Sequence, residues 1–102
     1  MNKEERKIYE EAISKWGKGP QTEMIIEECS ELITELSKLI KAIQKDKRKP
    51  TDETTDHLHE EIADVIIMIE QAQIIFDEKK INNYKSQKIE RLKMRLNKST
   101  KK

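Results

Sequence analysis

Apolar residues recur along most of the chain at the three- and four-residue spacing that is typical of amphipathic helices. Between residues 20 and 46 they form one stripe, which consists of Ile25, Cys29, Leu32, Leu36, Leu39 and Ile43. Ile26, Ile33 and Ile40 broaden this stripe on one side. A second stripe, between residues 56 and 78, consists of Leu58, Ile62, Val65, Ile69, Ala72 and Phe76. The pattern predicts two long helices, each with a wide apolar face.

Two shorter helices are expected at about 3–15 and 82–97, the second with a thin apolar stripe of Ile89, Leu92 and Leu96. Turn signals occur only at "GKGP" (17–20) and "RKPTDETTD" (48–56). Pro20 suits the first turn of the helix that follows it, and Thr55 or Asp56 is expected to cap the next. We therefore expect an all-α fold, a four-helix bundle built from antiparallel helices.

The composition indicates that one chain alone forms only a modest hydrophobic core. Of 102 residues, 34% are hydrophobic, 40% are charged and four are aromatic, so a single chain buries a modest core. We expect one domain over residues 1–102, completed by a second copy of the chain.

The single cysteine, Cys29, excludes an intrachain disulfide and favours a reducing, cytoplasmic location. No apolar stretch approaches the roughly 18 residues needed to span a bilayer, so no membrane partner is expected.

The two ends of the sequence differ in charge. Residues 79–102 contain ten Lys or Arg and one acid, Glu90, whereas residues 1–78 contain 11 bases and 19 acids. The basic segment, expected to be disordered from about 97 to 102, is compatible with binding to nucleic acid or to the phosphates of a small ligand. Simple solvation, or pairing with the acidic part of the protein, explains it equally well.

Carboxylates border both apolar stripes. At about 100° per residue, Glu28 and Glu31 face the same way one turn apart, and Glu61 and Asp64 repeat this spacing on the next long helix. If the two helices pair antiparallel through their stripes, these four groups meet at one rim. Their mutual repulsion then favours a hard cation, Mg²⁺ or Mn²⁺, as the neutralising partner. The alternative is a solvated acidic face, which is common on helices.

Taken together, "EECSEL" and "EEIADV" on consecutive helices resemble the ExxE…ExxD signature of MazG-like nucleoside triphosphate pyrophosphohydrolases. The flanking segments "KWGKGPQTEMIIEE" and "KIERLKMRL" are also similar to that family. The resemblance implies an all-α homo-oligomer, a dimer or tetramer. It also implies a Mg²⁺-dependent enzyme that hydrolyses a (d)NTP to the monophosphate and pyrophosphate, in nucleotide-pool housecleaning. The connection between the two motifs is slightly longer than the family pattern, in a polar segment where length is tolerated.

The resemblance also implies roles for individual residues. The metal ligands would be Glu28, Glu31, Glu61 and Asp64, and either Glu31 or Glu35 would act as the base that orients water. Substrate contacts would come from Trp16, Gln21, Lys38, Lys88 and Arg91, for each of which a core, capping or surface role is the alternative. His57 and His59 lack the HExxH spacing of zinc proteases, although His57 precedes Glu61 by one turn.

Two other functions remain open from the sequence. The first is a non-catalytic helical regulator whose basic C-terminal helix binds nucleic acid, although the MazG-like resemblance makes nucleic acid the less expected partner. The second is an inactive relative that binds a nucleotide as a sensor. The resemblance favours the hydrolase.

Overall fold

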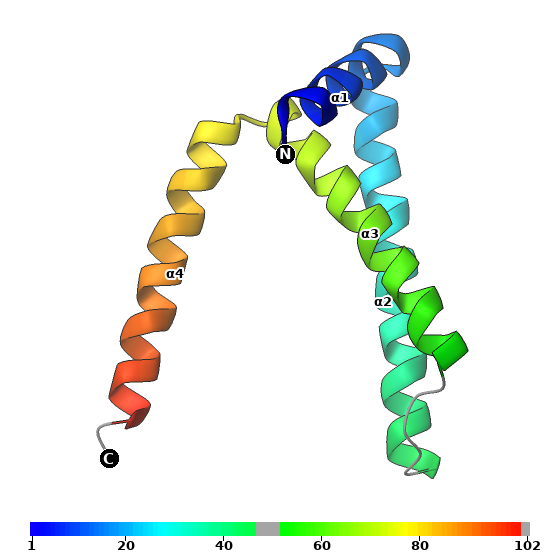
Figure 1. The fold of residues 1–102 in the computed structure, drawn as a ribbon, viewed down its shortest axis with the longest axis vertical. Helices are drawn as coiled ribbons and strands as arrows, with labels where there is room; N and C mark the ends of the chain where they lie inside the picture. Colours follow the sequence, from blue (N-terminus) through cyan, green and yellow to red (C-terminus); the bar gives the residue numbers. More distant parts are fainter. Residues whose placement is uncertain (47–51, 101–102) are drawn as a thin grey trace. The chain divides into compact units, whose positions relative to one another are not determined.

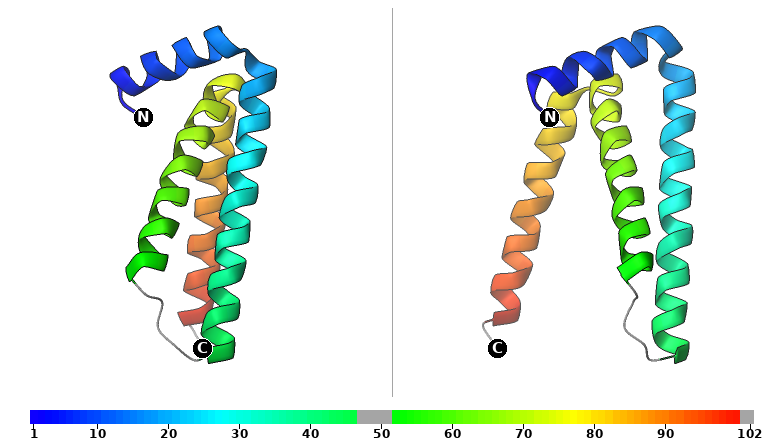
Figure 2. Two further views of the ribbon diagram at one scale, coloured as in Figure 1. Left: turned by 90° about the vertical axis from the view of Figure 1, so that its right-hand side faces the viewer. Right: turned by 45° about the vertical axis from the view of Figure 1, so that its right-hand side comes forward.

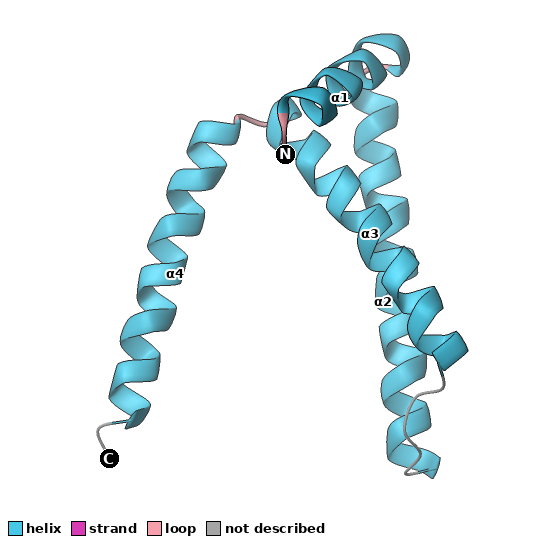
Figure 3. Cartoon of the chain, in the orientation of Figure 1, coloured by secondary structure: helices cyan, strands magenta, loops and turns pink. Residues whose placement is uncertain are grey.

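The structure of the chain, a computed structural model, describes residues 1–46 and 52–100. These residues form four helices and no strand (Figures 1 and 3): α1 (Lys3–Trp16), α2 (Lys18–Asp46), α3 (Asp52–Ile75) and α4 (Glu78–Thr100). The all-α fold class predicted from the sequence is therefore confirmed. None of the described helices has an apolar run long enough to cross a membrane.

Both limits of the last two helices differ from those predicted, and α3 ends at Ile75 instead of 78. Helix α3 begins at Asp52, so Thr55 and Asp56 lie inside it, and the position that would cap it falls at 47–51, outside the described residues. Helix α4 begins earlier than predicted because Asp77, with a φ of 82°, breaks the chain direction, and its Oδ1 accepts a hydrogen bond from the Lys80 N–H (3.3 Å). The tail predicted to be disordered from about 97 is helical as far as Thr100, and residues 101–102 lie outside the described part.

Local signals explain the start of α1 and the corner after it. Asn2 caps α1 through a capping box, in which its Oδ1 accepts from the Glu5 N–H (2.8 Å) and Glu5 Oε1 accepts from the Asn2 N–H (2.7 Å). Gly17 then turns the chain with a φ of 96°, a conformation that favours glycine. Pro20 lies in the first turn of α2, where a backbone N–H has no intrahelical acceptor.

The chain divides into two compact units, Met1–Ala72 and Gln73–Lys102. In the first unit α2 and α3 run antiparallel side by side, and α1 lies across the end of this pair where α2 begins (Figure 2). Gln21 of α2 is hydrogen-bonded to Gln71 of α3. Ten residues further along α2 and ten residues back along α3, Glu31 lies beside Glu61. These two pairs fix the register of the helices.

The first unit has a small core. Tyr9 and Met68 are the only buried apolar side chains among the residues described, and none of the described side chains is fully buried. The apolar stripe of α2 is divided: Ile25, Leu32 and Leu39 are half-buried, whereas Ile33 is 63% exposed. One chain therefore covers only part of the apolar surface that the sequence pattern marks.

Candidate metal and substrate site

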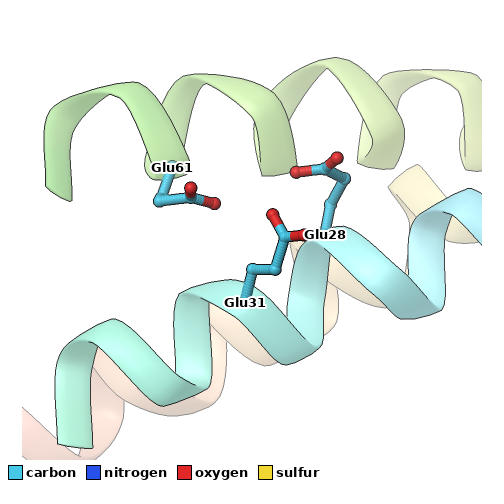
Figure 4. A group of neighbouring side chains, drawn as sticks. All are labelled: Glu28, Glu31 and Glu61. Carbon is cyan, nitrogen blue, oxygen red and sulfur yellow. The ribbon is translucent and has the colours of Figure 1, made fainter. Parts of the chain in front are cut away.

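Three glutamates converge between the two long helices of the first unit. Glu28 and Glu31 project from α2 toward Glu61 of α3 (Figure 4), and each offers a carboxylate oxygen within 4.8 Å of the others. We call these three residues the carboxylate cluster. The i, i+3 spacing of Glu28 and Glu31 puts both on one side of α2, and the antiparallel register brings the first turns of α3 against them. Three of the four predicted metal ligands thus lie together.

The cluster is electrostatically unfavourable without a cation. Burial raises the pKa of Glu28, and the charges of Glu31, Asp64 and Glu61 raise it further. Burial, followed by the charges of Glu31 and Asp64, likewise raises the pKa of Glu61. One buried oxygen of each residue, Oε2, has no hydrogen-bond partner. Among the described residues, no lysine or arginine forms an ion pair with either carboxylate.

Asp64, the fourth predicted ligand, is exposed and lies outside the carboxylate cluster. Its position one turn after Glu61 nevertheless brings its charge close enough to raise the pKa of both Glu28 and Glu61. Asp64 therefore belongs to the same electrostatic neighbourhood without sharing the close contact of the other three.

Glu35 lines a pocket that also contains Glu31 and Glu61 of the carboxylate cluster. The pocket has a volume of about 450 Å³ and is lined by Ser30, Glu31, Thr34, Glu35, His57 and Glu61. Glu35 Oε1 lies 3.8 Å from His57 Nε2 and 3.7 Å from Lys38 Nζ. The predicted base and one predicted substrate-binding lysine are therefore neighbours. His57, which the sequence placed one turn before Glu61, also lines the pocket.

Trp16 and Gln21 lie at the other end of the α2–α3 pair. They line a second pocket, of about 570 Å³, whose other residues are Pro20, Met24, Met68 and Gln71. The structure thus joins two predicted substrate-binding residues in one pocket. Lys88 and Arg91 are exposed and one turn apart on α4, in the second unit, so their contact with a substrate stays a prediction.

Sequence reasoning missed Gln71 and Met68. A signal for them exists, because Gln71 follows Asp64, and Met68 follows Glu61, by the same seven residues that separate Gln21 from Glu28. Two turns along paired antiparallel helices return side chains to nearly the same face. The carboxylate motifs could therefore have been extended by two turns in each helix to find the second pocket.

The donor set of the cluster consists only of carboxylate oxygens, which suit hard divalent cations such as Mg²⁺ and Mn²⁺. The unpartnered Oε2 atoms of Glu28 and Glu61 supply acceptors that a cation would satisfy. The residues present therefore fit a metal of this class. Comparisons with family models, curated proteins and solved structures found no match to this chain.

Proposed function

We propose that this protein is a Mg²⁺-dependent nucleoside triphosphate pyrophosphohydrolase, which cleaves a (d)NTP between the α and β phosphates. One observation supports the proposal above the others: three carboxylates from two helices lie within 4.8 Å, and two of them have a buried oxygen without a partner. Such an arrangement costs folding energy unless a cation binds there. The type of reaction is inferred from the sequence resemblance to MazG-like enzymes.

Glu28, Glu31 and Glu61 would hold the metal, with Asp64 adding negative charge beside them. A bound Mg²⁺ neutralises phosphate charge and lowers the pKa of a bound water. Glu35 is better placed than Glu31 to accept the proton of the attacking water, because Glu31 belongs to the carboxylate cluster. His57 Nε2 and Lys38 Nζ both lie within 4 Å of Glu35 Oε1, so positive charge can gather beside this carboxylate.

We propose in addition that the protein forms a homo-oligomer through α2. On α2 the open part of the apolar stripe follows a heptad repeat, with Ile26, Ile33 and Ile40 at one position and Cys29, Leu36 and Ile43 three residues later. The residues that follow each pair are Ser30, Ser37 and Gln44, which carry no charge to repel an identical helix. We call this surface the α2 seam, and a second copy of the chain is its proposed partner.

The test is a pyrophosphate-release screen across the common dNTPs and NTPs with Mg²⁺ or Mn²⁺. The purified chain should release pyrophosphate from at least one of them, and Glu31→Gln and Glu61→Gln should each lower the rate at least 100-fold, a typical loss for a removed catalytic group. Glu60→Gln, which alters an exposed neighbour of Glu61, is the matched control and should retain activity. Release of pyrophosphate that is unaffected by Glu61→Gln would refute the site.

One observation favours a second function. Helix α4 carries eight basic residues against Glu78 and Glu90: Lys79, Lys80, Lys85, Lys88, Arg91, Lys93, Arg95 and Lys98. A helix of this charge can bind nucleic acid with affinity that falls steeply with salt. Salt-dependent DNA binding together with no pyrophosphate release would favour this regulator. Nucleotide binding without turnover, measured by calorimetry, would instead favour a sensor.

A further inference from the structure

The solvent side of α2 carries opposite charges near its two ends. Glu23 and Glu27 lie one turn apart in the first half of the helix. Lys41 and Lys45 lie one turn apart in the second half. Each glutamate precedes one of the lysines by 18 residues, which is about five helical turns, so the four side chains lie along one line of the helix. Because like charges at i, i+4 repel, each pair is unfavourable by itself.

These four charges have no partner within the part of the chain that the structure describes. All four residues are exposed, and none of them forms an ion pair with another described residue. Lys38, which lies between the two pairs, differs because its Nζ is 3.7 Å from Glu35 Oε1. The two pairs are therefore available for opposite charges on another molecule.

The charged line runs beside the α2 seam, where the apolar surface is open. Ile26, Ile33 and Ile40 are 62%, 63% and 52% exposed. In the second half of the seam the surface forms a groove of about 350 Å³, which is lined by Leu36, Ser37, Ile40, Lys41 and Gln44. An apolar groove with a lysine at its edge suits a helix that brings apolar side chains and a carboxylate together.

The charges distinguish between the two ways in which an identical helix can lie on the α2 seam. In a parallel symmetric pair each residue lies beside its own copy, so Glu27 would meet Glu27 and Lys41 would meet Lys41. In an antiparallel pair the acidic half of one helix lies beside the basic half of the other. Charge complementarity therefore favours the antiparallel pair.

The apolar residues of the α2 seam define the register of such a pair. All six of them overlap when Ile33 faces Leu36 of the second copy, which also makes Cys29 face Ile40 and Ile26 face Ile43. In this register Glu27 is level with position 42 of the second copy, one residue from Lys41. The apolar contacts and the charges thus agree on one arrangement.

We propose that two copies pair antiparallel along α2, with Glu27 of each copy beside Lys41 of the other. The two-fold symmetry of the pair makes this contact twice. The same register brings Ser37 of the second copy beside Ser30, which also lines the pocket of Glu35, so the second copy forms part of the wall of that pocket. This inference rests on the homo-oligomer of the proposed function and adds its orientation and contacts.

Cross-linking of cysteines tests the orientation on the full-length protein. In the antiparallel pair Cys29 faces residue 40 of the second copy and lies about 16 Å along the axis from the second Cys29, which is 11 residues at about 1.5 Å each. Ile40→Cys, which keeps Cys29, should therefore give a covalent dimer with a short bismaleimide. The wild type should remain a single chain on a denaturing gel. Ile26→Cys, on the same seam, is the matched control and should also remain a single chain.

Charge reversal tests the contact itself. Glu27→Lys brings lysines together at both symmetric contacts, so it should raise the Kd of the dimer about tenfold in sedimentation equilibrium. The double variant Glu27→Lys, Lys41→Glu exchanges the two charges and should return the Kd close to the wild-type value. Glu60→Lys, the same exchange at an exposed glutamate of α3, should leave the Kd unchanged. Because Glu27 and Lys41 are exposed, these variants should fold even if Ile40→Cys does not.

The outcomes separate this inference from the proposed function. A wild-type dimer that is cross-linked through Cys29 alone would show parallel pairing, which keeps the α2 seam but overturns the antiparallel contact. A folded Ile40→Cys protein that gives no covalent dimer overturns it too, as does a double variant that associates no better than Glu27→Lys. Pyrophosphate release by the wild type is measured independently, so the hydrolase can stand when the antiparallel pair fails, and the reverse.

Discussion

At the scale of single residues, Tyr9 is the clearest case of a side chain that joins two helices. It is buried, and its hydroxyl donates a hydrogen bond of 2.8 Å to Glu70 Oε1 on α3. Tyr9→Phe should lower the free energy of unfolding by about 1–3 kcal/mol, because the charged acceptor loses its donor. Urea unfolding at pH 7 measures the loss. Tyr84→Phe, at an exposed tyrosine of α4, should change stability by less than about 0.5 kcal/mol.

The same residue predicts a change at alkaline pH. Burial, together with the bond to Glu70, raises the pKa of Tyr9 from 10.0 to about 12. The unfolded chain loses this proton first, so the stabilisation is present below pH 10 and is lost between pH 10 and about 12. The wild-type curve of stability against pH should therefore fall toward that of Tyr9→Phe over this interval. Parallel curves would show that Tyr9 is not buried in its protonated form.

Glu28 and Glu61 predict a second change in stability, which begins at acidic pH. Their raised pKa values mean that the metal-free folded protein holds protons that the unfolded chain has lost. Stability should therefore decline as pH rises above 4.5, through the raised pKa values, relative to a Glu28→Gln, Glu61→Gln variant. At neutral pH, Mg²⁺ at 100 times its Kd should restore about 2.7 kcal/mol in the wild type only. A melting temperature that Mg²⁺ does not change would identify these acids as a solvated face.

At the scale of helices, the sequence pattern predicted four helices, but it could not predict their register. Helical periodicity shows that Glu28 and Glu31 border the stripe of α2, yet it does not show which residues of α3 lie opposite. That depends on how far one helix slides along the other, which packing between distant residues decides. For this reason Glu61 was found from its motif, whereas Gln71, opposite Gln21, was missed. Asp64 satisfied the motif but lies outside the close cluster.

The corner between α1 and α2 gives a prediction in which two glycines should respond oppositely. Gly17 has a φ of 96°, so Gly17→Ala should destabilise the protein by about 1 kcal/mol through backbone strain. A Cβ there would lie 3.6 Å from Pro20 Cδ, an ordinary contact that adds no clash. Gly19→Ala, in the first turn of α2 with nothing within 4 Å of the added Cβ, should stabilise by up to about 1 kcal/mol. Thermal unfolding compares the two, and equal effects would contradict this account.

At the scale of the whole molecule, the small core and the open α2 seam require a common explanation. A chain of 102 residues in which no described side chain is fully buried has limited hydrophobic stabilisation. Exposed isoleucines at heptad spacing are costly in water unless another surface covers them. The proposed second copy would provide a surface of the same spacing with the same uncharged flank. Association would also explain how so highly charged a sequence reaches a stable fold.

This explanation predicts that Ile33→Lys separates the copies. Ile33 lies in the middle of the α2 seam and is 63% exposed in the single chain, so a lysine there would be solvated in the monomer but buried and unpaired in the assembly. Analytical ultracentrifugation at tens of micromolar should show a dimer or tetramer for the wild type and a monomer for the variant. Ile8→Lys makes the same exchange at an exposed isoleucine of α1 and should leave the assembly intact. A monomeric wild type, or dissociation by Ile8→Lys alone, would show that the α2 seam is not the contact between copies.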